Sequence, residues 1–158
     1  MTKIVIIGIG QELRGDDAIG SIIARGWQSK NQNTPYLRTE ICPLPGLELL
    51  DLFEDAQTAI LVDAVQSGAK PGSVHITNME QLVSFGAGSG SVHGFGVAET
   101  LALGQQIVPS PIPEKLIVVG IEALHLNLGE PISSEVKASI PKAISEIEFI
   151  VNQYLPTT

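Results

Sequence analysis

The chain has 158 residues, of which 44% are hydrophobic and 16% are charged, and its formal net charge is −8. This size fits one compact domain, residues 1–158, and the composition is that of a globular chain rather than an intrinsically disordered one. We expect no nucleic-acid partner, because phosphate binding requires a basic face and only nine Lys and Arg residues are present.

The apolar runs and the single cysteine indicate where in the cell the protein is located. No apolar run approaches the roughly 20 residues that a membrane-spanning helix requires, and the apolar run after Lys3 is too short for the core of a signal peptide. The single cysteine, Cys42, has no partner for an internal disulfide, which is typical of a reducing compartment. We therefore expect a cytoplasmic protein with no membrane partner.

The first half of the chain alternates between strand and helix patterns. The β-branched run Lys3–Ile7 predicts a strand buried on both faces, which Gly8 and Gly10 would end. Ala18–Gln28 has apolar residues at helical spacing. A strand at Tyr36–Ile41, a proline-rich turn at Cys42–Gly46 and a helix at Leu47–Phe53 follow.

The second half continues the alternation. Thr58–Val62 predicts a second buried strand that ends at Asp63, and Ser84–Gly94 predicts a glycine-rich mobile loop. The other expected elements are strands at Val74–Thr77 and Leu116–Gly120, a helix at Val97–Gln106, and a long helix at Ser133–Tyr154, capped by Ser133 or Ser134 and restarted or kinked at Pro141. This order predicts an α/β fold with three layers: a twisted, mostly parallel sheet sandwiched between helices.

Polar residues follow two of the buried strands directly. In open α/β sheets, ligands bind outside the carboxyl ends of the strands. Asp16 and Asp17 lie in the turn after the first strand, Asp63 follows the third, and His93 lies in the glycine-rich segment. Two carboxylates and one imidazole suit a divalent first-row metal, although their spacing matches no local metal motif. The turns that carry these residues could converge in space, and the set would then make a reasonable metal site.

Each of these residues also has a purely structural interpretation. Asp16 or Asp17 could cap the following helix, and Asp63 could cap a turn within Asp63–Gly68. A single loop histidine such as His93 is usually just exposed to solvent. His75 in a strand and His125 in a loop are weaker candidates.

A nucleotide or anion site at the glycine turn is a second possibility. The segment GIGQELRGDDAIG has two of the glycines of a dinucleotide-binding turn, but Leu13 occupies the position of the third. Asp16 and Asp17 would also repel a pyrophosphate at the start of the helix. An α/β binding module is therefore an alternative to an enzyme.

Five segments, in order along the chain, resemble the [NiFe]-hydrogenase maturation proteases. They are IVIIGIGQELRGDDAIG, PGLELLDLF, AILVDAV, SVHGFGVAETL and IVVGIEAL. The resemblance extends from Lys3 to the final helix. It implies the family fold, which is phosphorylase/hydrolase-like. It also implies removal of a C-terminal extension from a hydrogenase large-subunit precursor, cut after a basic residue once nickel is in place.

The resemblance carries residue roles with it. It implies that Asp17, Asp63 and His93 are both the metal ligands and the catalytic residues. Nickel, presented by the precursor, is the expected ion, and cadmium or zinc could substitute. Water would then hydrolyse the peptide bond, polarised by the metal or assisted by one aspartate. No Ser/His/Asp or Cys/His nucleophile is evident. A monomer is expected, as is common in the family.

The chain departs from the family pattern at two places. Gln11 stands where asparagine is usual, and the CPLPG turn at Cys42–Gly46 replaces an Asp-Gly-Gly-like stretch. The second departure concerns the substrate groove more than the metal site. It leaves open a non-proteolytic assembly partner that binds the hydrogenase precursor without cutting it.

Overall fold

The computed structural model describes residues 3–78, 81, 90–91, 94–107 and 112–155. Within these ranges, six strands form one sheet. The main strand order is β2-β1-β3-β6-β4, and all neighbours are parallel except β4 with β6. The strands are β1 Ile4–Ile9, β2 Leu37–Cys42, β3 Thr58–Gln66, β4 Val74–Asn78, β5 Gly90–Ser91 and β6 Lys115–Glu122.

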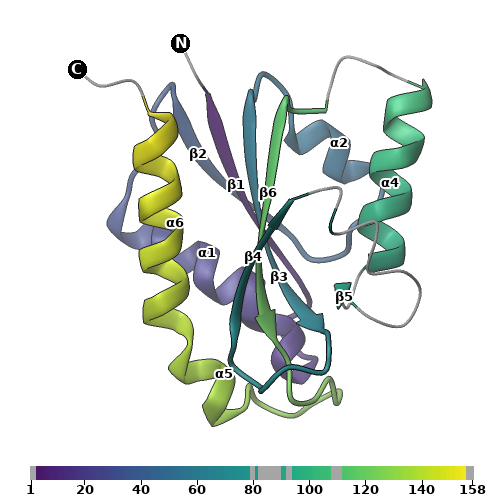
Figure 1. The fold of residues 1–158 in the computed structure, drawn as a ribbon, viewed down its shortest axis with the longest axis vertical. Coiled ribbons are helices and arrows are strands. Elements are labelled where there is room, and N and C mark those ends of the chain that lie inside the picture. The colour runs from purple at the N-terminus through teal and green to yellow at the C-terminus, as the bar shows by residue number, and fades with distance from the viewer. Residues whose placement is uncertain (1–2, 79–80, 82–89, 92–93, 108–111, 156–158) are drawn as a thin grey trace.

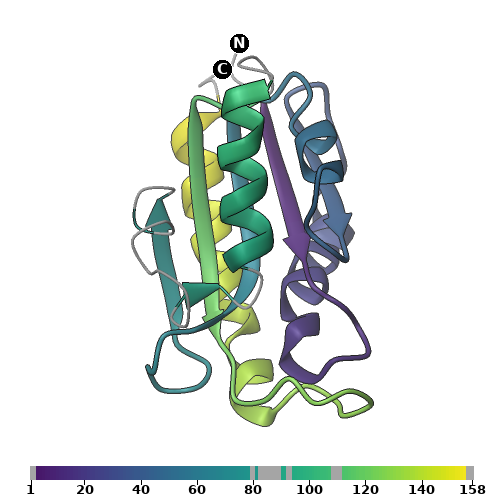
Figure 2. The same cartoon turned by 90° about the vertical axis from the view of Figure 1, so that its right-hand side faces the viewer.

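Helices cover both faces of the sheet, as Figures 1 and 2 show. One face packs against α1, α5 and α6, and the other against α2 and α4. The three layers confirm the predicted fold class. The helices are α1 Ile19–Lys30, α2 Glu48–Leu52, α4 Gly94–Ile107, α5 Ser134–Ala138 and α6 Ile140–Tyr154, with a short 3-10 helix, η1, at Gly15–Ala18. None of the described helices is long and apolar enough to cross a membrane.

The side chains of β3 alternate between the two cores. Ile60 and Val62 belong to the core beneath α1 and α6, whereas Ala59 and Leu61 belong to the core beneath α2 and α4. Successive strand residues point to opposite faces, so Asp63 faces the α2 and α4 side. Burial on both faces explains the nearly continuous apolar run of this strand.

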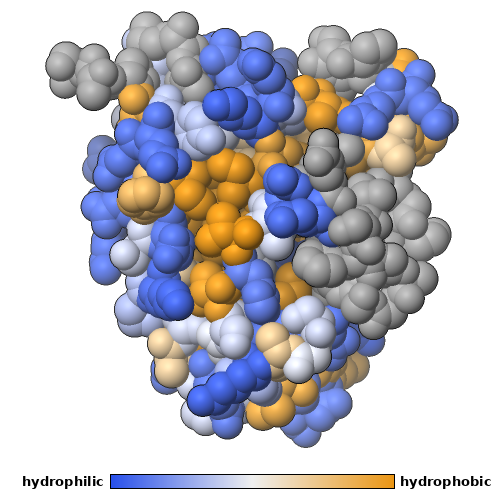
Figure 3. All heavy atoms as spheres, in the orientation of Figure 1, coloured by the Kyte–Doolittle hydropathy of each residue, from blue (hydrophilic) through white to orange (hydrophobic). Residues whose placement is uncertain are grey.

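Two short elements complete the sheet. β5 pairs antiparallel with β3 at Val65 and Gln66, beyond Val62, the last residue of β3 that pairs with β1. β4 is an edge strand, paired with β6 alone among the described strands. Figure 3 shows hydrophobic surface beside α6 near this edge, where Ile76 of β4 is 45% exposed.

Gly8 does not end the first strand, contrary to the prediction. It lies within β1, paired with Ile41 and Val62. A Cβ atom at Gly8 would lie 2.5 Å from the carbonyl oxygen of Gly20 in α1. The glycine therefore serves close packing of α1 on the sheet rather than a turn.

The C-terminal helical segment follows the prediction. Ser133 caps α5, because its Oγ accepts a hydrogen bond from Val136 N at 3.4 Å. The helix breaks at Ser139, and Pro141 lies in the first turn of α6. Proline is tolerated there because the first turn leaves its backbone N–H groups without intrahelical partners.

Candidate active site

Among the described residues, four acidic side chains are buried. Their segments lie at or next to the carboxyl ends of the parallel strands, which point to the lower end of the sheet in Figure 1. Burying a carboxylate is costly unless hydrogen bonds or a cation compensate. The surroundings of each acid therefore indicate its role. The four are Asp16, Asp17, Asp63 and Glu122, each no more than 2% exposed.

Asp17 is held against the turn that leaves β1. Gly10 has φ +134°, and a Cβ atom there would lie 1.8 Å from the Asp17 carbonyl oxygen. The backbone N–H of Gln11 donates to Asp17 Oδ2 at 2.9 Å. Only glycine permits this crossing. Since the contact uses the backbone of Gln11, it does not depend on the side chain that departs from the family pattern.

Asp16 has a different task. Its carboxylate accepts hydrogen bonds from Leu124 N at 2.8 Å and His125 N at 3.1 Å. It also accepts from Ser133 N at 2.6 Å and Ser133 Oγ at 2.9 Å. Burial raises the pKa of Asp16, but the hydrogen bonds from Ser133, Leu124 and His125 outweigh burial and leave that pKa below its ordinary value. Asp16 fastens the loop after β6 to the turn after β1.

Neither aspartate caps α1, so that structural interpretation of the pair is wrong. The residues preceding η1 and α1 are Arg14 and Ala18, and neither makes a side-chain capping bond. The chain enters α1 through a 3-10 turn that buries both carboxylates instead. Asp16 bonds to the loop after β6, while Asp17 bonds to the turn after β1.

The prediction that the strand ends at Asp63 is wrong, because Asp63 lies inside β3. It pairs with Gly120 of β6, and the strand continues to Gln66. A turn-cap role within Asp63–Gly68 is therefore also wrong. A polar residue can lie within an apolar strand without ending it, because pairing with β6 continues past Asp63 to Val65.

The electrostatic influence of Asp63 reaches Cys42, which lies at the end of β2. Burial, followed by the negative charges of Glu48 and Asp63, raises the pKa of Cys42 to about 11. The Cys42 thiol donates to the Leu44 carbonyl oxygen at 3.4 Å. A buried thiol with a raised pKa is a poor nucleophile. This agrees with the absence of a cysteine mechanism from the sequence interpretation.

The segments that carry Asp17 and Asp63 meet at this edge. η1 contacts β3. Gly20, about one helical turn beyond Asp17, approaches the strand so closely that a Cβ atom there would lie 2.2 Å from the Val62 carbonyl oxygen. Val62 directly precedes Asp63. The fold thus brings these two predicted site residues to one end of the sheet.

His93 lies outside the described residues. Within them, no group of three His, Cys, Asp or Glu side chains is placed to hold a metal ion. Asp17 and Asp63 supply two carboxylates, and these fit a divalent first-row cation because their oxygens are hard donors and their charges offset its own.

Gly8 in β1 and Gly10 after it allow close backbone contacts within the protein. Where a phosphate would approach in a dinucleotide site, the Gly20 carbonyl packs against Gly8, and the Asp17 carbonyl packs against Gly10. The buried carboxylates of Asp16 and Asp17 also lie at the start of the helix. This arrangement disfavours the nucleotide-binding alternative.

Glu122 is a buried acid that the sequence interpretation missed. Its Oε1 accepts from Ser67 N at 2.8 Å and Gly68 N at 3.0 Å. Its Oε2 accepts from Ser67 Oγ at 2.8 Å and lies 3.1 Å from His75 Nε2. The same search for acids near strand ends could have found it, because it is the last residue of β6.

The family model described as hydrogenase maturation protease matches residues 44–150. The chain belongs to the hydrogenase maturation protease family. Asp63 and His93 fall within the matched range, and Asp17 precedes it. Most of the CPLPG turn is also included, so this departure does not separate the chain from the family. The resemblance inferred from the sequence motifs is confirmed.

Individual members of the family align over most of their length. The hydrogenase 2 maturation protease of Escherichia coli K12 is 26% identical over 148 residues, covering 92% of this chain and 88% of that protein. The hydrogenase expression/formation protein HupD of Rhizobium leguminosarum bv. viciae is 26% identical over 144 residues, covering 90% and 70%. The structure of the hydrogenase maturating endopeptidase HybD from Escherichia coli superposes with a TM-score of 0.84 at 25% identity, covering 96% and 93%.

Proposed function

We propose that this chain is an endopeptidase that removes the C-terminal extension of a [NiFe]-hydrogenase large-subunit precursor after nickel insertion. The observation that carries the proposal is the burial of Asp17 and Asp63 at one end of the sheet, in a chain of the hydrogenase maturation protease family. Two buried carboxylates on contacting segments favour a bound cation. In this proposal the nickel belongs to the substrate.

Asp17, Asp63 and His93 are the proposed nickel ligands. Support for including His93 comes from chain connectivity. Ser91 of β5 pairs with Val65, two residues beyond Asp63, and His93 follows Ser91 by two residues. A stretch of two residues spans at most about 7 Å, which supports including His93 in the proposed site. Cadmium or zinc could take the place of nickel.

Cleavage would be hydrolytic, with water as the nucleophile. Cys42 is unsuited to attack, because its thiol is buried and its pKa is raised to about 11. A divalent metal can polarise a carbonyl group or a bound water. Asp17 and Asp63 would hold the metal-bearing end of the precursor in register, and cleavage would then depend on prior nickel insertion.

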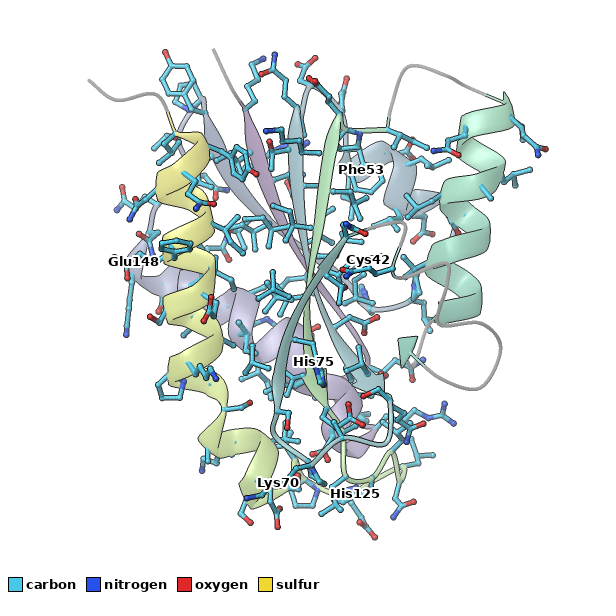
Figure 4. The ribbon with its side chains drawn as sticks, viewed as in Figure 1. Cys42, Phe53, Lys70, His75, His125 and Glu148 are labelled. Carbon is cyan, nitrogen blue, oxygen red and sulfur yellow. The ribbon has the colours of Figure 1, made fainter. Side chains whose placement is uncertain are left out.

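A processing assay tests the proposal. The chain is mixed with nickel-loaded and nickel-free precursor, and the mass of the large subunit is followed. We expect only the loaded precursor to shorten, and Asp17→Asn and His93→Ala to abolish processing while circular dichroism shows an intact fold. The matched control is Glu148→Gln, an exposed acid on α6 far from this end of the sheet (Figure 4). Wild-type processing by His93→Ala would overturn the ligand assignment.

The same assay separates the enzyme from a non-proteolytic assembly partner. Such a partner would co-purify with the nickel-loaded precursor without changing its mass. The CPLPG turn is the feature that favours this alternative, because it departs from the family pattern beside the helix α2. Processing at substoichiometric amounts of the chain would exclude it.

We also propose that the chain acts as a cytoplasmic monomer. Both faces of the sheet are covered by helices of the same chain, so a second copy is not required to bury them. Light scattering coupled to size exclusion would test this, with a mass near 16.7 kDa expected.

A further inference from the structure

His75 and Asp63 lie in one row across the sheet. Gly120 of β6 pairs with Asp63 on one side and with His75 on the other. Directly paired residues of neighbouring strands point to the same face, so His75 and Asp63 share the face that α2 and α4 cover. At the usual strand spacing their Cα atoms are about 10 Å apart.

Gly120 contributes no side chain between these two residues. A Cβ atom there would lie 2.8 Å from Val65 Cγ1, so the methyl groups of Val65 pack over the glycine instead. Val65 is 7% exposed, so the surface over Gly120, the residue that pairs with both Asp63 and His75, is apolar. In Figure 4, His75 lies on β4, apart from His125 and Lys70 at the lower end of the molecule.

Glu122 sets the orientation of His75. The carboxylate is buried, with a side chain 3% exposed, whereas the His75 side chain is 32% exposed. Oε2 of Glu122, which also accepts from Ser67 Oγ, lies 3.1 Å from His75 Nε2. In the tautomer that carries its hydrogen on Nε2, the imidazole donates to this oxygen and presents the lone pair of Nδ1.

The contact between His75 and Glu122 is not needed to hold the turn after β3. Ser67 N, Ser67 Oγ and Gly68 N already satisfy the carboxylate of Glu122. The imidazole of His75 is thus an additional group, which contacts the buried Glu122 carboxylate and is itself partly exposed. A carboxylate that orients a histidine whose second nitrogen is a base is the arrangement found in general-base catalysis.

We propose that His75 is the general base and acid of the cleavage reaction, and that Glu122 is its positioning residue. The inference rests on the proposed function. A bound cation draws electron density from its ligands and lowers their basicity, so Asp17, Asp63 and His93 are poor proton acceptors when they hold the metal. A separate base on the same face supplies what they lack.

The proposed proton transfers balance in two steps. His75 Nδ1 takes a proton from water as the water oxygen bonds to the scissile carbonyl carbon. The resulting imidazolium returns that proton to the amide nitrogen as the carbon–nitrogen bond breaks. The products are a new carboxyl terminus and a free amine, and the imidazole is regenerated in its starting state.

The test measures cleavage and binding separately. Single-turnover cleavage of nickel-loaded precursor is followed for His75→Ala, His75→Gln and Glu122→Gln, with precursor binding and melting temperature measured for each. We expect both His75 variants to lose about 10²- to 10⁴-fold in cleavage rate. Binding should stay within about threefold of wild type. Added imidazole should restore part of the rate of His75→Ala but not of Glu122→Gln. Thr77→Val, on the same strand and face, is the matched control.

Two outcomes would overturn the inference. One is cleavage by His75→Ala at nearly the wild-type rate, and the other is a loss of rate fully matched by a loss of precursor binding. Failure of the wild-type chain to cleave would contradict the proposed function as well. Cleavage by both wild type and His75→Ala would contradict only the role of His75.

Discussion

Asp16 and Ser133 are 117 positions apart and share two hydrogen bonds, from Ser133 N at 2.6 Å and from Ser133 Oγ at 2.9 Å. Ser133 is also the N-cap of α5. One carboxylate therefore joins the turn after β1, the loop after β6 and the start of the C-terminal helices. This junction lies directly beside Asp17, so the site and the stability of its frame are linked.

Replacing Asp16 by asparagine should destabilise the protein by about 2–4 kcal/mol at neutral pH, because an amide NH₂ would face N–H donors and charge-assisted bonds would be lost. Urea unfolding measures this. Glu135→Gln, an exposed acid in the first turn of α5, is the control and should change stability by less than about 0.5 kcal/mol. Equal stabilities of Asp16→Asn and wild type would show that the junction does not stabilise the fold.

The same carboxylate should make stability depend on pH in the acid range. The pKa of Asp16 is lower in the folded state than its ordinary value of 3.8. Its contribution is therefore fully present above that value and is lost as the pH falls through the lower, folded pKa. The stability difference between wild type and Asp16→Asn should stay constant from pH 7 to 5 and shrink below pH 4. A difference that grows on acidification would contradict the assigned direction.

Close packing of α1 should be sensitive at Gly20 and tolerant at Gly26. A Cβ atom at Gly20 would lie 2.2 Å from the carbonyl oxygens of Ile9 and Val62, whereas one at Gly26 would meet only Ile144 Cδ1 at 3.4 Å. Gly20→Ala should cost about 3 kcal/mol or more and reduce processing by shifting Asp17 away from Asp63.

Gly26→Ala is the matched control in the same helix. It should stabilise the protein by about 0.5–1 kcal/mol, because alanine has the better helix propensity and meets no severe contact there. Thermal unfolding of both variants measures the difference. Equal effects at the two positions would contradict the packing argument.

Cys42 should be dispensable for processing. Cys42→Ala is expected to process precursor at a rate within about threefold of wild type, and iodoacetamide should not inhibit the native protein, because the thiol is buried and protonated at neutral pH. The variant should lose about 1 kcal/mol of stability from the smaller side chain. Loss of processing with an intact fold would point to a cysteine nucleophile instead.

The architecture was predictable because the buried strands are short apolar runs, and strands buried on both faces have this signature regardless of their partners. The boundaries were less predictable. Gly8 and Asp63 were interpreted as strand ends, since glycine and aspartate disfavour strands locally. Gly8 stays within β1 because it pairs with both β2 and β3, and Asp63 stays within β3 because it pairs with β6.

The site was predictable in part for a related reason. The rule that ligands bind at the carboxyl ends of strands directs attention to Asp17 and Asp63, and the structure brings their segments together. The division of labour between Asp16 and Asp17 was not predictable, because it depends on bonds to Leu124, His125 and Ser133 that no local pattern encodes. Glu122 could have been found as an acid at the end of β6, but its bonds to Ser67 and Gly68 after the neighbouring strand β3 could not, because they join residues far apart in the sequence.

The most direct test of the central claim compares Asp63→Asn with Glu148→Gln on one nickel-loaded large-subunit precursor, using mass spectrometry to follow loss of the C-terminal extension. Wild type and Glu148→Gln should shorten the precursor. Asp63→Asn should fold normally and leave the precursor intact. Shortening by Asp63→Asn at the wild-type rate would contradict the claim that this end of the sheet performs the cleavage.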